Sequence, residues 1–206
     1  MLRIGLTGGI ASGKSVASRR FERRGATIVD HDDLAREAVK PGSAALADIA
    51  REFGESLIAD GQLDRAAMAE LAFGDAVLLE RLNAIVHPYV YSLAVAADRR
   101  AREGGAKVVV HAIPLLVETN QGGRFDLVAT VAAPVSLRIG RLTSGRGMTR
   151  EQAEARIAAQ ATDAERAAIS DVVLDGSGTV ANLEAQVDAF WDEHVPVSAG
   201  AATVKE

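Results

Sequence analysis

The fold of this chain is decided by Gly8-Gly9-Ile10-Ala11-Ser12-Gly13-Lys14-Ser15, close to its N-terminus. This stretch fits the phosphate-binding pattern G-x-x-x-x-G-K-[ST] at every fixed position. The apolar run Leu2–Leu6 before it predicts a buried strand, and the residues from Val16 onward predict a helix. Strand, glycine-rich loop and helix, in that order, are the context in which this motif binds a nucleoside triphosphate. We therefore expect a nucleotide site here rather than a turn without a ligand.

The residue types in this loop indicate what each position does. Glycines let successive backbone N–H groups turn toward phosphate oxygens, and the positive end of the following helix favours the same anion. Lys14 is expected to reach the β- and γ-phosphates, and Ser15 to offer its hydroxyl to Mg²⁺ as the metal ligand. The expected ATP-binding residues are Gly8, Gly9, Ile10, Ala11, Ser12, Gly13, Lys14, Ser15 and Val16.

Composition narrows the class of protein. The 206 residues include 23 Lys and Arg against 28 Asp and Glu, a net charge of −5, so the chain lacks the basic field of nucleic-acid binders. It has no cysteine, which excludes disulfides and thiolate metal sites. No apolar run approaches the roughly 20 residues that cross a bilayer, and no signal-peptide pattern opens the chain. We expect a cytoplasmic protein with no membrane or nucleic-acid partner; the oligomeric state stays open.

Short apolar runs alternate with longer helical stretches along the chain, which is typical of a parallel α/β sheet. The runs are rich in Val, Ile and Leu with little alternation, as expected when helices cover both faces of the sheet. The predicted fold is a three-layer α/β/α P-loop core with a five-stranded parallel sheet. Its predicted strands are Leu2–Thr7, Thr27–Val29, Lys107–His111, Leu127–Val131 and Val172–Leu174.

The segment between the second and third strands is too long for an ordinary crossover and has mostly helical spacing. Leu34–Val39 predicts a short helix, and Ser43 is expected to cap the next one. Apolar spacing at Met68, Leu71 and Ala72, and again at Leu78, Leu82 and Ile85, predicts two more helices. We expect an inserted helical domain at about 34–105 that covers or selects a substrate.

A second excursion, between the fourth and fifth strands, predicts a lid over about 143–165. Val135–Leu142 predicts a helix, Thr143–Met148 a flexible polar break, and the capping box Thr149-x-x-Gln152 a helix from Arg150 to Gln160. Arg146, flanked by glycines, is the best candidate to swing onto the γ-phosphate, although a plain exposed loop is the alternative. Arg138 and Arg141 fit ordinary surface charges equally well. The P-loop domain is expected over 1–195, followed by a flexible tail at 196–206.

Acidic residues follow the second predicted strand, at the edge where α/β sheets bind ligands. Strand alternation would point Asp30 and Asp32 to the same side, and a carboxylate there can accept the proton of an attacking hydroxyl. We favour Asp32 because it lies further out. Asp30 could instead be structural, and Asp33 could cap or lead the following helix.

Other residues carry weaker indications. His87, before Pro88, fits a helix boundary as well as a substrate contact. Leu115 and Leu116 follow the third strand in a rigid turn, and on physical grounds apolar residues there are more often core than ligand contacts.

Taken together, the motifs resemble the dephospho-CoA kinase family. The resemblance runs from Leu2 to about Phe190 and is specific because the motifs occur in order. The matching segments are the loop itself, Val29–Asp32, Val39–Gly42, Asn83–Pro88, Ile113–Glu118 and Arg156–Gln160.

The resemblance implies transfer of the γ-phosphate of ATP to the ribose 3′-hydroxyl of dephospho-CoA, the last step of coenzyme A synthesis. It implies that Asp32 is the base, Lys14 bridges the phosphates and Arg146 is the lid arginine. Leu115, Leu116 and His87 would contact dephospho-CoA, and the helical insertion would be the CoA-binding domain.

Departures from the family pattern are Ala11 for a common Gly, Ala112 for a common Asp, Gly176 for a common Asn, and a lid without its usual acid. Two alternatives remain. One is another P-loop kinase of nucleosides or small molecules. The other is a nucleotide-dependent switch without transferase activity, for which we find no clear water-positioning group.

Overall fold

The computed structural model describes residues 1–64, 67–68 and 75–195. The chain divides into two compact units. One, called the core unit, joins Met1–Ile28 to the residues from Gly105 onward, and the other, called the insertion unit, is Val29–Gly104. The tail predicted at 196–206 lies outside the described residues.

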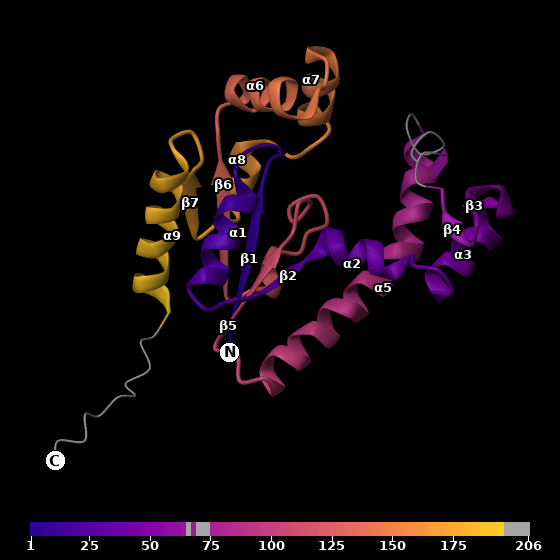
Figure 1. The fold of residues 1–206 in the computed structure, drawn as a ribbon, viewed down its shortest axis with the longest axis horizontal. Helices are drawn as coiled ribbons and strands as arrows, with labels where there is room; N and C mark the ends of the chain where they lie inside the picture. Colours follow the sequence, from indigo (N-terminus) through magenta and orange to yellow (C-terminus); the bar gives the residue numbers. More distant parts are fainter. Residues whose placement is uncertain (65–66, 69–74, 196–206) are drawn as a thin grey trace. The chain divides into compact units, whose positions relative to one another are not determined.

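A five-stranded sheet organises the core unit, in the order β2-β5-β1-β6-β7 (Figure 1). β1 pairs in parallel with β5 and β6, and β6 with β7. The predicted strands are confirmed, each end within one residue of its expected position. Their bounds are β1 Leu2–Gly8, β2 Thr27–Asp30, β5 Val108–Ala112, β6 Leu127–Ala132 and β7 Val172–Asp175.

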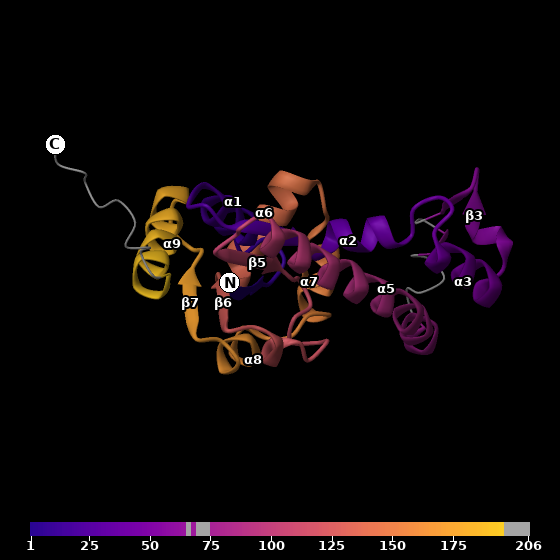
Figure 2. The ribbon, with the colours of Figure 1, turned by 90° about the horizontal axis from the view of Figure 1, so that it is seen from below.

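Helices cover both faces of this sheet. Figure 2 shows α1 and α8 on opposite sides of it. The side chains of Ile4 and Leu6, on the central strand β1, are fully buried, and Phe21 of α1 meets Phe190 of α9 edge to face at 5.6 Å. The helices of this unit are α1 Lys14–Arg23, α6 Val135–Arg146, α7 Arg150–Ala158, α8 Asp163–Ala168 and α9 Val180–His194, with a 3₁₀ turn, η2, at Gly122–Arg124.

The break predicted at Thr143–Met148 is wrong for its first four residues, because α6 continues to Arg146. The hydroxyls of Thr143 and Ser144 both donate to the carbonyl of Gly140, so these polar side chains bond to the helix itself. The helix ends where Gly147 adopts a left-handed conformation, with φ of 64°. The capping box that opens α7 is present as predicted, and the helix ends at Ala158, two residues early.

The insertion unit is mainly helical, as expected, and packs around its own core of Val39, Ala45, Ile49, Leu57 and Met68. Ser43 caps α3 by accepting the N–H of Leu46. Leu71 and Ala72 of one predicted helix lie outside the described residues. The elements are α2 His31–Ala38, α3 Ala44–Phe53, the 3₁₀ turn η1 Glu55–Leu57, β3 Ile58–Ala59, β4 Gln62–Leu63 and α5 Ala76–Glu103.

Two elements of this unit differ from those that the sequence predicts. The hairpin β3–β4 was not predicted, although its turn, Asp60-Gly61, is a recognised hairpin signal and both residues have positive φ. The helix boundary considered at His87 is wrong, because α5 runs through Pro88 to Glu103. No helix among the described residues combines the length and apolarity needed to span a membrane.

Candidate nucleotide-binding site

The phosphate loop (Gly8–Ser15) connects the end of β1 to the start of α1. Three other helices of the core unit, α7, α8 and α9, begin with a threonine whose hydroxyl accepts a backbone N–H: Thr149, Thr162 and Thr179. α1 begins instead with Gly13, whose φ is 116°, and no described side chain caps it. Val16 donates its N–H to the carbonyl of Gly13 at 2.8 Å, whereas no described residue bonds to the N–H groups of Lys14 and Ser15, which are left for an anion at the positive end of the helix dipole.

Close approach as well as backbone conformation requires glycine at position 8, and space is also limited at position 9. A Cβ atom on Gly8 would lie 2.6 Å from the carbonyl oxygen of Val131. A Cβ on Gly9 would lie only 2.0 Å from Nη1 of Arg138. Ala11 has a φ of 61°, in the region that favours glycine, so this departure from the family pattern carries backbone strain.

Ser15, in the first turn of α1, is exposed, and its hydroxyl makes no hydrogen bond with another described residue. Magnesium at a nucleotide site usually takes one or two protein oxygens and completes its shell with phosphates and waters. The described residues contain no group of three or more carboxylates and imidazoles that could hold a metal by themselves. The hydroxyl of Ser15, at the start of α1, could supply the single protein oxygen that this way of binding Mg²⁺ needs.

Arg138 and Arg141, which the sequence left as alternatives to Arg146, contact or approach the phosphate loop. Arg141 donates to the carbonyl of Ala11 at 2.9 Å and to that of Gly176 at 2.8 Å. Arg138 is 3% exposed, and its Nη2 donates to Oδ2 of Asp163 at 3.1 Å. The view of Arg138 and Arg141 as ordinary surface charges is therefore wrong.

Arg146, preferred from the sequence, is exposed at the C-terminal end of α6 and makes no hydrogen bond or ion pair with any other described residue. Its role as the lid arginine stays a prediction.

Burial lowers the pKa of the Arg138 guanidinium; Asp163 opposes this shift and the positive charge of Arg166 adds to it.

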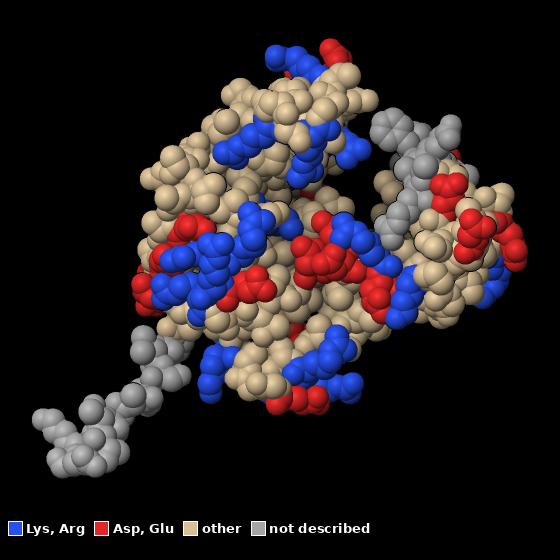
Figure 3. All heavy atoms as spheres, viewed as in Figure 1, with Lys and Arg blue, Asp and Glu red and all other residues tan. Residues whose placement is uncertain are grey.

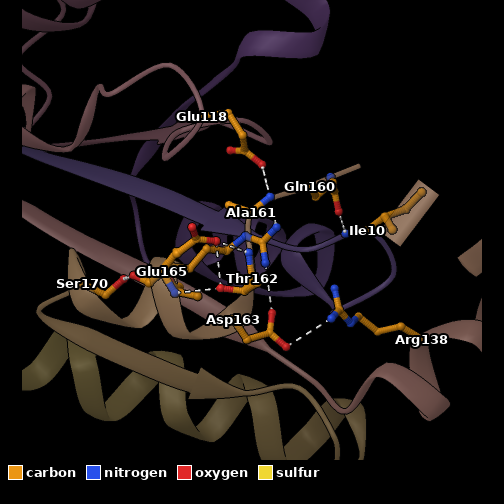
Figure 4. Close-up of polar contacts among 11 residues, drawn as sticks. Ile10, Glu118, Arg138, Gln160, Ala161, Thr162, Asp163, Glu165 and Ser170 are labelled. Atoms are coloured by element: carbon orange, nitrogen blue, oxygen red, sulfur yellow. Dashed lines mark hydrogen bonds and ion pairs between the residues drawn. The ribbon is translucent and has the colours of Figure 1, made fainter. Parts of the chain in front are cut away.

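A network of polar contacts joins the phosphate loop to the chain between α7 and α8 (Figure 4). The side-chain oxygen of Gln160 accepts the N–H of Ile10 at 2.7 Å, and Glu118 accepts the N–H of Ala161 at 2.8 Å. Arg166 is fully buried and donates through Nη1 to Oδ1 of Asp163 at 3.0 Å. Glu118 and Gln160 end two of the segments that carry the family resemblance, but no local pattern in the sequence reveals a buried charge or a distant acceptor, so the roles of these side chains were not predicted.

Gly176 also borders the phosphate loop, after β7. A Cβ atom there would lie 2.0 Å from the carbonyl oxygen of Ser12, so the close packing of the two loops requires glycine at this position. This steric need gives a physical reason for the departure from the family's common Asn.

Of the two leucines predicted to bind substrate, only one is accessible. Leu115 is 43% exposed, whereas Leu116 is 0% exposed and packs with Ile113 and Val128. The prediction of a substrate contact for Leu116 is therefore corrected: it is a core residue.

The insertion unit holds the predicted base. β2 ends at Asp30, whose carboxylate caps α2 by accepting the N–H of Asp32 at 2.8 Å. Asp32 therefore lies exposed in the first turn of a helix, and its predicted placement by strand alternation is wrong. Asp33 does not cap the helix, but it lies in the first turn, as the alternative expected, and forms an ion pair with Arg36. His87 is exposed on α5.

Comparisons with known proteins agree on a family. The family model described as dephospho-CoA kinase matches residues 2–182. A dephospho-CoA kinase of Thermobifida fusca is 46% identical over 94% of this chain and 96% of its own length, and one of Corynebacterium jeikeium is 47% identical over 93% and 98%. A crystal structure from Thermus thermophilus superposes with a TM-score of 0.83 at 33% identity, covering 95% of this chain and 98% of the other. The chain belongs to the dephospho-CoA kinase family.

Proposed function

We propose that this chain transfers the γ-phosphate of ATP to the ribose 3′-hydroxyl of dephospho-CoA, giving coenzyme A and ADP. The observation that carries the proposal is the start of α1: a complete phosphate-binding motif whose helix is capped by no side chain of the residues that the structure describes. In a chain of this family, such a helix start supports ATP as the phosphoryl donor.

On the ATP side, the N–H groups at the start of α1 and the ammonium group of Lys14 would hold the phosphate chain. Ser15 would hold Mg²⁺, which, when bound, neutralises charge on the phosphates during transfer. Arg146 would join when the segment at about 143–165 closes as a lid and excludes water, which protects ATP from hydrolysis.

On the acceptor side, Asp32 would take the proton of the 3′-hydroxyl. As the O3′–H bond breaks, O3′ forms a bond to the γ-phosphorus and the bond to the β–γ bridging oxygen breaks, which releases ADP. The exposed carboxylate of Asp32, in the first turn of α2, bonds to no other described residue and can accept this proton, whereas its backbone N–H is used by Asp30.

The insertion unit would bind dephospho-CoA through His87, and Leu115 is a second proposed contact of this substrate. A cavity of about 420 Å³ opens between α3 and α5, and Pro88, the neighbour of His87, lines it. Tyr89 also lines this cavity, and its hydroxyl donates to Asp48 at 2.6 Å. A concave surface with polar groups fixed in place supports ligand binding by this unit.

The test is a coupled assay of ADP release with Mg·ATP and dephospho-CoA, together with detection of coenzyme A. We expect wild-type turnover to depend on dephospho-CoA and Asp32→Asn to lower kcat by roughly 10²–10⁴-fold, because a general base is lost. Asp33→Asn is the matched control: it removes a neighbouring carboxylate on the same helix turn and should leave kcat unchanged.

Three other outcomes are informative. ADP release without coenzyme A would indicate a nucleotide-dependent switch, and turnover only with nucleosides would indicate a different P-loop kinase. Coenzyme A formation by a fully active Asp32→Asn variant would keep the function and remove Asp32 as the base.

A further inference from the structure

The junction between α7 and α8 is Ala159–Thr162, and its two central residues, Gln160 and Ala161, make contacts in two directions. Gln160 reaches Ile10 in the phosphate loop, 150 positions away in sequence. Ala161 donates its N–H to Glu118, at the end of the segment that follows β5. Figure 4 shows both contacts, so this junction lies between the phosphate loop and the segment that contains Leu115.

The contact to Ile10 bears on how the loop binds phosphate. Ser12 donates its N–H to the carbonyl of Gly9 at 3.0 Å, which closes a turn around Ile10 and Ala11. Gln160 occupies the N–H of Ile10, inside this turn, and Arg141 binds the carbonyl of Ala11 from α6. The turn is thus held from both sides, and its position sets the direction of the N–H groups that follow it.

The junction itself is held in place by charge. Oε1 of Glu118, which accepts the N–H of Ala161, also lies 3.9 Å from Nη2 of the fully buried Arg166. The two arginines, Arg138 and Arg166, share the carboxylate of Asp163. Because a buried cation is stable only with nearby anions, Glu118 and Asp163 have fixed positions, and they fix the junction with them.

From this arrangement we propose that Gln160 is a positioning residue for nucleotide binding, and that Glu118 anchors it. Gln160 holds the phosphate loop in its binding conformation through the N–H of Ile10. This inference rests on the proposed function only in taking ATP as the nucleotide, because it concerns the loop and not the acceptor.

The test compares Gln160→Met, which keeps the length of the side chain but cannot accept the hydrogen bond, with the wild type. We expect the Kd for Mg·ADP and the KM for ATP to rise about 5–10-fold, the effect of one lost hydrogen bond. The KM for dephospho-CoA should be unchanged. Amide hydrogen exchange at Ile10 should accelerate in the variant without nucleotide.

Gln186→Met is the matched control. The side-chain oxygen of Gln186 also accepts a backbone N–H at 2.7 Å, that of Asp175, but it does not bond to the phosphate loop. Because Nε2 of Gln186 also donates to the carbonyls of Asp175 and Asn182, the control should lower the melting temperature at least as much as Gln160→Met, with no change at Ile10. If Gln160→Met lowered only the melting temperature and left the Kd for Mg·ADP unchanged, the contact would be merely structural and the proposal would be wrong.

Glu118→Met and the double variant with Gln160→Met test the anchor. If both residues act through one junction, the Kd of the double variant for Mg·ADP should exceed that of the single variant with the higher Kd by no more than about twofold. If the rise in Kd of the double variant instead equalled the product of the two single-variant rises, the two residues would act independently and Glu118 would not be the anchor. Because binding of Mg·ADP and exchange at Ile10 need no acceptor, these results stand even if dephospho-CoA proves not to be the substrate.

Discussion

At the scale of single residues, the phosphate loop has positions where the backbone conformation favours glycine, and one of the residues in such a conformation is an alanine, Ala11. Ala11 adopts a φ of 61°, while Arg141 donates to its carbonyl and Gln160 accepts the N–H of the preceding residue, Ile10. An L-residue in this conformation costs roughly 1–2 kcal/mol, which the surrounding bonds offset.

Ala11→Gly should therefore stabilise the protein by up to about 1 kcal/mol, because relief of strain exceeds the extra chain entropy of glycine. The melting temperature should rise by roughly 2–4 °C. Ala155→Gly, at an exposed position within α7, is the control of opposite sign and should lower stability by roughly 0.5–1 kcal/mol. A lower melting temperature for Ala11→Gly would mean that the loop is not strained at this residue.

At the scale of helices, ion pairs join α1 to α9 across 168 positions of sequence. Asp188 accepts from Nε of Arg20 at 2.8 Å and from Nη2 at 2.5 Å, and Arg24 adds a third bond at 3.3 Å. Figure 3 shows acidic and basic side chains interleaved over these two helices. The hydrogen bonds from Arg20 lower the pKa of the Asp188 carboxyl, and Arg24 adds to the shift.

This lowered pKa predicts a pH-dependent stability. The Asp188 carboxylate stabilises the fold at pH values above its unfolded pKa of about 3.9, and this contribution is lost as the pH falls through the lower, folded pKa. Asp188→Asn should lower the melting temperature by a few degrees at pH 7, and the gap to wild type should shrink below about pH 4. Glu154→Gln, at the exposed pair with Arg150, should change little at any pH. A gap that stays constant down to pH 3 would contradict the prediction.

At the scale of the whole molecule, the described residues form two units with separate hydrophobic cores. Ile49 is fully buried in the insertion unit, with Val39, Ala45, Leu57 and Met68 as its neighbours. Val187 is fully buried in the core unit. Separate cores allow one unit to lose structure while the other keeps it.

Ile49→Ala should destabilise the insertion unit by about 2–5 kcal/mol, because it removes buried methyl groups and leaves a cavity. Native-state hydrogen exchange should then accelerate in α3 while β1 and β6 keep their protection. Val187→Ala is the reciprocal control and should accelerate exchange in the sheet. Equal loss of protection in α3 and in the strands after Ile49→Ala would show that the two cores unfold together.

The sequence by itself determined the five sheet strands and the phosphate loop, because each depends on a short run of neighbouring residues. The short run Val108–Val110 is entirely β-branched, which favours a buried strand, and the capping box of Thr149 and Gln152 is complete within four residues. It also contained a signal for the β3–β4 hairpin, in Asp60-Gly61, that we did not use.

Only the tertiary structure decided which polar side chains support the phosphate loop. The sequence favoured Arg146 because glycines flank it, yet Arg138 and Arg141 are the arginines at the loop. Leu115 and Leu116 are neighbours of the same type, and packing alone buries one and exposes the other. The bond from Ile10 to Gln160 joins residues 150 positions apart. Burial and long-range hydrogen bonds arise when distant segments pack together, and no local pattern specifies them.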